Sequence, residues 1–147
     1  MKALLVFAMR ASQSDHPSSA HVRGQSTMTN RFITYRLTIR LRSGIHLTIG
    51  RFGNHYFPAG DYAYTGSARR NIEARIARHL RQEKKLRWHI DYLLSAPEAE
   101  IIKVEKFMEP ECRINQNQSG TVLLAGFGAS DCRSACGSHL KYLGRKG

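Results

Sequence analysis

Apolar and polar side chains alternate in the stretch that follows residue 32. From residue 33 to residue 41 every second side chain is apolar, and those between are Thr or Arg. A period of two is typical of a strand with one face buried and the other in solvent. The apolar positions of this predicted strand are Ile33, Tyr35, Leu37, Ile39 and Leu41.

Two shorter segments continue the pattern. Residues 45–49 alternate after a Ser-Gly turn signal, and residues 61–65 place Tyr62 and Tyr64 on one face. A Gly-Asn pair marks a turn between the two segments. The sequence therefore predicts a small antiparallel sheet in this half of the chain.

A period of four replaces the alternation after residue 70 and predicts a helix. Ile72, Ile76 and Leu80 recur every four residues and form one apolar stripe that can pack on the sheet. Asn71 directly precedes the stripe and is a preferred N-cap residue. We therefore expect a helix that begins after Asn71.

Short elements follow in the second half. A helix is expected over about residues 86–95, ending before Pro97. Residues 99–107 alternate weakly and predict an edge strand, residues 109–117 predict a short helix, and residues 138–143 a short ordered element. The predicted fold class is α+β, with a small antiparallel sheet flanked by helices.

The two ends of the chain lack such periodicity. Residues 1–30 start with a short apolar run and then become rich in Ser, His, Gln and Thr. We expect them to form a disordered extension, with either Met1 or Met28 as the initiator. The predicted domain covers residues 31–143, and residues 144–147 are expected to fray.

The net charge of the chain predicts a class of binding partner. The 147 residues include 23 Lys and Arg against 11 Asp and Glu, a formal net charge of +12 with His neutral. Such a surface favours polyanions through counterion release and electrostatic steering, and nucleic acid is the expected partner. No apolar run approaches the roughly 20 residues of a membrane helix, so we expect no membrane insertion.

Basic side chains cluster in and around the first predicted helix. Few acidic residues compensate them, which favours contacts to phosphates that fix position without reading bases. An ordinary solvated surface is the alternative. The expected phosphate-binding residues are Arg69, Arg70, Arg78, Lys84 and Lys85.

Three cysteines lie in the last quarter of the chain. An odd count is a poor disulfide framework and is typical of a reducing compartment, so we expect a cytoplasmic protein. Cys132, Cys136 and His139, together with the distant Cys112, could bind structural Zn²⁺ tetrahedrally. The set lacks the paired close spacings of strong zinc signatures, which favours reduced, buried cysteines instead.

The most specific pattern is the segment from Gly60 to His79, GDYAYTGSARRNIEARIARH. Its order, Y-x-G-S followed by N-x-x-x-R-x-x-x-H, resembles the second half of the GIY-YIG nuclease signature. RHL, WHIDYLL, GFGASDC and SHL follow in order. The full set resembles the Uri-like endonuclease branch, an uncharacterised domain family, over about residues 31–143.

The resemblance implies an endonuclease that hydrolyses phosphodiester bonds in DNA with one divalent ion, Mg²⁺ or Mn²⁺. A first-strand tyrosine, which helps to deprotonate the attacking water, corresponds to Tyr35. The second-strand tyrosine corresponds to Tyr64, with Tyr62 as the alternative. The first motif departs from Gly-x-Tyr, because Ile33 stands in the glycine position. Gly44-Ile45-His46 matches the letters of GIY better, but places His in the position of the tyrosine, so it ranks second.

The remaining roles lie on the predicted helix and after the third strand of the family. Arg75 corresponds to the arginine that contacts the scissile phosphate, and His79 would hydrogen-bond a phosphate or a tyrosine. The metal-binding glutamate corresponds to Glu111, with Glu109 as the alternative.

The chemistry of phosphodiester hydrolysis suits these residue types. The transition state gathers negative charge on phosphate oxygens, which an arginine and a metal can stabilise. A single glutamate with water molecules suits Mg²⁺. A phenol with its ordinary pKa of about 10 is a poor base unless cations lower that pKa, and the Arg-rich helix supplies cations. Core tyrosines with satisfied hydroxyls are the alternative.

Two further polar residues belong to the branch pattern. His89 and Asp91 either face the cleft and support the metal or the base, or form a buried polar network. Ser130, Asp131 and His139 are also candidates to line the cleft. The altered first motif keeps a second function open, a non-catalytic nucleic-acid-binding module with the same fold.

Overall fold

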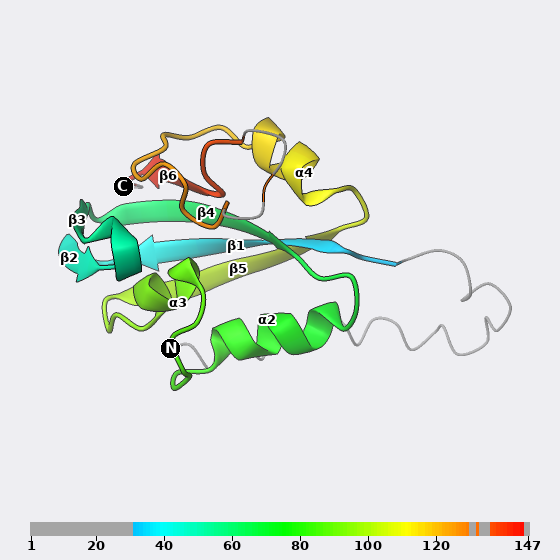
Figure 1. Ribbon diagram of the computed structural model, residues 1–147, viewed down its shortest axis with the longest axis horizontal. Coiled ribbons are helices and arrows are strands. Elements are labelled where there is room, and N and C mark those ends of the chain that lie inside the picture. The colour runs from blue at the N-terminus through cyan, green and yellow to red at the C-terminus, as the bar shows by residue number, and fades with distance from the viewer. Residues whose placement is uncertain (1–30, 130–131, 133–135, 146–147) are drawn as a thin grey trace, which may run out of the picture.

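The computed structural model describes residues 31–129, 132 and 136–145. Its centre is a four-stranded antiparallel sheet in the order β5-β1-β4-β6 (Figure 1). The strands are β1 (Thr34–Leu41), β4 (Gly60–Ser67), β5 (Ala99–Phe107) and β6 (Leu140–Gly144). The predicted α+β class with an antiparallel sheet is confirmed. The expected disordered extension, residues 1–30, and the last two residues of the expected frayed end lie outside the described residues.

Among the described residues, three helices flank this sheet: α2 (Ile72–Leu80), α3 (His89–Leu94) and α4 (Glu111–Asn117). In Figure 1, α2 and α4 appear on opposite sides of β1 and β4, so these two central strands run between them. No helix in the described part of the chain is long and apolar enough to span a membrane.

Strand β1 has the predicted alternation. Its apolar side chains, from Tyr35 to Leu41, are at most 1% exposed. Thr34 is also fully buried, although it belongs to the polar face, because its Oγ1 donates a hydrogen bond to the carbonyl of Glu109 at 2.6 Å. This bond ties the start of β1 to the turn before α4.

Strand β4 is longer than the predicted segment 61–65 and is buried along almost its whole length. The reason is its central position, with β1 on one side and β6 on the other. Its buried acidic residue, Asp61, is paired with Arg40, whose Nε donates to Asp61 Oδ1 at 2.9 Å. Strand β6 runs through Gly144, a residue that the sequence assigned to the frayed end.

The predicted second strand does not join the central sheet. It forms β2 (Ile45–Thr48), which pairs only with β3 (Asn54–Phe57) in a separate antiparallel ribbon around the 3-10 helix η3 (Gly50–Phe52). Strand β3 escaped prediction because only Phe57 among its side chains is fully buried, so the segment shows no apolar alternation.

Local hydrogen bonds determine where α2 and α3 begin. The Asn71 side chain accepts from the backbone N–H of Ala74, and α2 begins directly after it, as predicted. Its predicted stripe is buried, with Ile76 at 0% exposure. Helix α3 starts at His89 rather than near residue 86, because Asp91 accepts from the N–H of Trp88 and holds that residue in an extended conformation.

The remaining predicted elements are present. Strand β5 lies at the edge of the sheet, as expected. Helix α4 begins at Glu111, after Pro110, two residues later than predicted. Proline lacks the backbone donor and suits a helix start.

We predict that two substitutions of Asn71 separate its contribution as a helix cap from its contribution as a residue that tolerates left-handed backbone. Asn71 lies in the left-handed region, with φ 50° and ψ 57°, and also caps α2. Asn71→Ala removes the cap and adds backbone strain, so we expect a loss of about 2 kcal/mol in the free energy of unfolding. Asn71→Gly relieves the strain and should cost only a few tenths of a kcal/mol. Urea denaturation measures both, and equal losses in the two variants would contradict this account.

Candidate functional site

A pocket of about 460 Å³ opens between the central strands and the helices. Strands β1 and β4, helices α2 and α4, the segment that leads into α3 and the segment before β6 all contribute to it. The residues that line it are Tyr35, Tyr64, Gly66, Ser67, Arg75, Arg87, Trp88, His89, Glu111, Cys112, Gly128, Cys132 and His139.

Of the five residues that the resemblance assigns to the site, four line this pocket: Tyr35, Tyr64, Arg75 and Glu111. The fifth, His79, does not line it and is hydrogen-bonded to Tyr35. The alternative candidates lie elsewhere. The Tyr62 hydroxyl donates to the carbonyl of Pro58, and His46 packs against Tyr56 on the β2–β3 ribbon. Glu109 is exposed between β5 and α4.

A buried hydrogen bond of 2.7 Å joins Tyr35 Oη on β1 to His79 Nε2 on α2. His79 is only 2% exposed. Gly66, the cross-strand partner of Tyr35, makes room for this ring, because a Cβ at that position would lie 2.5 Å from Tyr35 Oη. The glycine of the Y-x-G-S motif is therefore required by the close approach of Tyr35.

Burial raises the pKa of Tyr35 and of Tyr64, and the neighbouring Arg75 lowers both pKa values less than burial raises them. Arg75 therefore acts in the expected direction, but the expectation of a tyrosine with a net lowered pKa is wrong for this pocket. Both phenols stay protonated at neutral pH, because desolvation of the phenolate outweighs the attraction of the cation.

His79 is neutral as well. Burial, together with nearby cations such as Lys84, lowers its pKa to about 3. Its Nδ1 is buried without a hydrogen-bond partner among the described residues. A bare lone pair is a less costly orphan than an N–H. We therefore assign the proton to Nε2, which donates to Tyr35 and leaves the hydroxyl hydrogen of Tyr35 for a group in the pocket.

Arg75 is held at the pocket wall by two contacts. Its Nη1 donates to the carbonyl of Ser67 at 3.0 Å, and its guanidinium lies 4.7 Å from the centre of the Trp88 ring. The Arg78 guanidinium contacts the same ring at 4.3 Å. Trp88, which the sequence analysis did not assign to the site, therefore positions Arg75 through a cation–π contact.

Asp91 belongs to a buried polar network and does not line the pocket. Its carboxylate accepts two hydrogen bonds of 2.9 Å from Arg78 and two of 2.8 Å from the N–H groups of Arg87 and Trp88. Burial alone would raise the pKa of Asp91, but the Arg78 bonds and the two N–H groups outweigh it and lower that pKa. Of the two interpretations left open, the structure supports the network for Asp91.

The expected phosphate-binding residues fall into two groups, those that are bonded within the protein and those that remain exposed. Arg78 is committed to Asp91, and Lys84 Nζ donates to the carbonyls of His79 and Arg81. Both therefore stabilise the region between α2 and α3. The side chains that remain exposed are those of Arg69, Arg70 and Lys85.

His89, the other open case, does line the pocket. Its Nδ1 accepts a hydrogen bond of 2.9 Å from the backbone N–H of Gly128, so its proton resides on Nε2. Burial lowers the pKa of His89. Of the further cleft candidates, His139 also lines the pocket, whereas Ser130 and Asp131 lie outside the described residues.

Glu111 is the first residue of α4, and each oxygen of its carboxylate accepts a hydrogen bond. Oε1 accepts from Ser67 Oγ and Oε2 from His139 Nδ1, each at 2.7 Å. Burial opposes ionisation, but these two hydrogen bonds outweigh it and lower the pKa of Glu111. The carboxylate is therefore charged in the pocket. Ser67 directly follows the Y-x-G motif, but nothing in the sequence indicated that it would meet Glu111.

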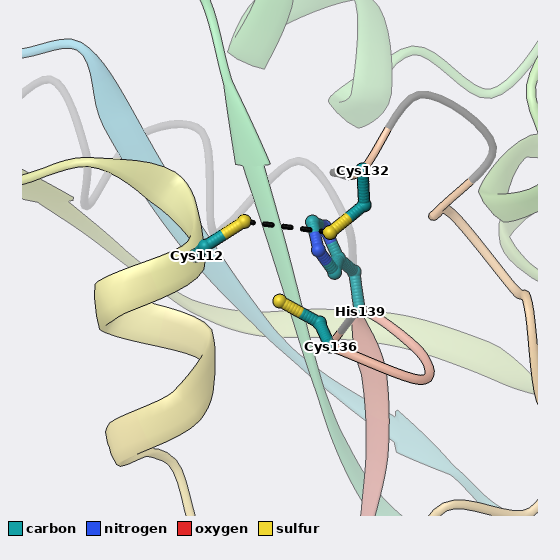
Figure 2. Close-up of side chains that lie close together, drawn as sticks. All are labelled: Cys112, Cys132, Cys136 and His139. Carbon is teal, nitrogen blue, oxygen red and sulfur yellow. Dashed lines mark hydrogen bonds between the residues drawn. The ribbon is translucent and has the colours of Figure 1, made fainter. Parts of the chain in front are cut away.

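Figure 2 shows that the side chains of the four candidate zinc ligands, three cysteines and one histidine, point toward one another. Their ligand atoms all lie within 4.8 Å of one another, so the cluster could hold a metal ion. Cys112 Sγ and Cys132 Sγ are 3.5 Å apart, and no disulfide joins them. Cys112 joins the other three from α4, a meeting that their spacing in the sequence did not indicate. The residues are Cys112, Cys132, Cys136 and His139.

The fold and the pocket define a small antiparallel α+β domain with a half-buried carboxylate, Glu111, beside a cluster that could hold a metal ion. The chain belongs to the family described as domain of unknown function DUF123, whose model matches residues 34–147. The match starts at the first residue of β1 and includes every element described above. No curated protein and no solved structure matches the chain.

We predict that buried His79 makes stability pH-dependent. Its folded pKa of about 3 lies below the ordinary value of 6.5. The unfolded chain therefore binds a proton that the folded chain does not. Stability should be complete above about pH 6.5 and fall by about 1.4 kcal/mol per pH unit as the pH drops toward 3.

Urea denaturation at several pH values measures this slope in the wild type and in His79→Gln, which retains a donor to Tyr35. The difference between the two should grow as the pH falls. The exposed histidine variant His46→Gln is the matched control and should follow the wild type. Parallel pH profiles for wild type and His79→Gln would contradict a neutral, buried imidazole.

Proposed function

We propose that the protein is a metal-dependent endonuclease of the GIY-YIG type that hydrolyses phosphodiester bonds in DNA. One observation carries the proposal: the two tyrosines, the arginine and the glutamate that the resemblance selects line one pocket, although they come from four different elements. The competing candidates Tyr62, His46 and Glu109 do not line it.

Arg75 is the group that we assign to the scissile phosphate. Its guanidinium is already fixed by Trp88 and by the Ser67 carbonyl, so little reorganisation is needed when negative charge develops on the phosphate oxygens. A fixed cation of this kind stabilises the transition state more than the ground state.

Tyr35 and Tyr64 act as neutral hydroxyls in this proposal. The Tyr35 oxygen already accepts from His79 and has a second lone pair for the attacking water, while its hydrogen can donate to a phosphate oxygen. The water oxygen bonds to phosphorus and the bond to the leaving oxygen breaks. One water proton passes to solvent through the open pocket, and the leaving oxygen takes a proton from solvent.

Glu111 is the residue that we assign to a divalent ion, Mg²⁺ or Mn²⁺. Among the described residues it is the only acidic side chain in the pocket, and its charged oxygens each accept one hydrogen bond and keep a lone pair. A single carboxylate with waters suits these hard ions. When bound, such an ion supplies positive charge to the phosphate and a water of lowered pKa.

The sulfur cluster requires a different ion. Thiolates are soft ligands, and three of them with one imidazole form a set that is typical of tetrahedral zinc and unsuited to Mg²⁺. We therefore assign zinc to the cluster and keep it distinct from the ion at Glu111.

We also propose that the DNA backbone follows the N-terminal end of α2. A second hollow there is lined by Arg31, Arg69 and Arg70, which are exposed. Exposed arginines can contact phosphates without reading bases. Arg69 and Arg70 lie two and three residues after Ser67, which lines the pocket.

Cleavage of branched, nicked and linear DNA in the presence of Mg²⁺ or Mn²⁺ tests the proposed activity. We expect Arg75→Ala, Tyr64→Phe and Glu111→Gln each to lower the cleavage rate about 100-fold, because each removes a preorganised group that faces the transition state. The rates are measured in single-turnover assays with purified protein.

The matched controls are the competing candidates. Tyr62→Phe and Glu109→Gln change the same residue types outside the pocket and should cleave at the wild-type rate. If the wild type binds DNA but does not cleave it, or if the pocket variants cleave as fast as their controls, the endonuclease proposal is wrong. The first outcome would support the non-catalytic nucleic-acid-binding module.

Salt titration of DNA binding tests the proposed backbone path. The double variant Arg69→Ala/Arg70→Ala should weaken binding to all sequences alike and reduce the slope of log affinity against log salt by about 2. Arg42→Ala, at the opposite end of β1, is the control and should leave the slope unchanged. An unaltered slope in the double variant would place the phosphate contacts elsewhere.

A further inference from the structure

We propose that a zinc ion in the cluster of Cys112, Cys132, Cys136 and His139 orients the Glu111 carboxylate through the His139 ring. His139 is thus a positioning residue for the candidate active site. The catalytic consequence rests on the proposed function of Glu111, whereas the metal-binding part stands without it.

The two nitrogens of His139 have separate tasks. Nδ1 is hydrogen-bonded to Glu111 Oε2 at 2.7 Å. Nε2 is buried and lacks a hydrogen-bond partner among the described residues, and the whole side chain is only 3% exposed. Burial lowers the pKa of His139, but the bond to Glu111 and the neighbouring cysteines outweigh burial and raise that pKa to about 9, so the metal-free ring is protonated on both nitrogens. Zinc takes the Nε2 lone pair by displacing that proton, while Nδ1 keeps its bond to Glu111.

The sulfur atoms stand at suitable separations. The four ligand atoms lie within 4.8 Å of one another, and two of the sulfurs are 3.5 Å apart. Tetrahedral zinc with Zn–S bonds of about 2.3 Å needs sulfurs about 3.8 Å apart. Small side-chain rotations therefore convert the observed cluster into a zinc site (Figure 2).

Glu111 is coupled to this site in two ways. It receives the Nδ1–H of a ligand histidine, which is the usual role of a carboxylate behind a zinc-bound imidazole. It also directly precedes Cys112 in the first turn of α4, so ligation of Cys112 anchors the backbone that carries the carboxylate. Ser67 holds the other oxygen, which leaves Glu111 one orientation in the pocket.

The test begins with metal content. Elemental analysis of the purified full chain should find about one zinc per chain, and Co²⁺ exchanged into the site should give the intense thiolate charge-transfer absorption of a tetrahedral sulfur site. Cys136→Ser should weaken that absorption. Absence of bound metal, with a Cys112–Cys132 disulfide found instead by thiol counting, would overturn the zinc site.

The coupling is tested by zinc affinity in competition with a chelator. Glu111→Gln leaves all four ligands intact but weakens the acceptor of the His139 proton, so zinc affinity should fall about 10- to 100-fold at unchanged stoichiometry. Glu109→Gln is the matched control and should bind zinc as the wild type does. Circular dichroism confirms that both variants fold.

The outcomes separate the two proposals. Equal zinc affinity in Glu111→Gln and Glu109→Gln would overturn the coupling, whatever the cleavage assay gives. Zinc binding that depends on Glu111, in a protein that cleaves no DNA, would support the coupling and contradict the endonuclease proposal.

Discussion

The hydrogen bond between Tyr35 and His79 is the contact on which the geometry of the pocket depends. It ties the central strand β1 to α2, and it forms only because Gly66 on β4 leaves room for the Tyr35 ring. Arg75 lies one turn before His79 on the same helix, so the bond that fixes α2 also brings the guanidinium to the pocket. Glycine, tyrosine, histidine and arginine thus act as one unit built on two strands and a helix.

A second layer of contacts keeps that unit in place. Asp91 is fully buried, and its charge is compensated by Arg78 and by two backbone N–H groups. Removal of one partner from such a pair leaves an uncompensated charge, which is far more costly than the pair is stabilising. Because Arg78 and Arg75 both contact Trp88, the network around Asp91 also fixes the wall behind the arginine of the pocket.

The sequence predicted the elements whose signals are local. The alternation of β1, the apolar stripe of α2 and the Asn71 cap are read within a few residues, and the structure contains all three. Strand β3 has no alternation, and the late start of α3 depends on Asp91 reaching back to Trp88, so neither was predictable from periodicity.

The same difference between local signals and long-range contacts applies to the residues of the site. Tyr64 and Arg75 were selected by an ordered motif, and Glu111 by its place after the third long strand. The partners of Glu111 come from Ser67 and His139, which are distant in sequence and meet only in the folded chain. The protonation states of the pocket tyrosines could not be predicted from the sequence either. The degree of burial decides whether a nearby arginine or desolvation has the larger effect on a tyrosine pKa.

The position of His139 has a consequence for metal selection in the proposed site. Its ring takes part in two sets of ligands, because Nδ1 is bonded to the Glu111 carboxylate and the ring also belongs to the cluster with three cysteines. Hard ions favour the carboxylate side and soft ions the sulfur side. Under the two proposals, an ion at Glu111 and zinc at the cysteines use different ligands, and the His139 ring links the two sites.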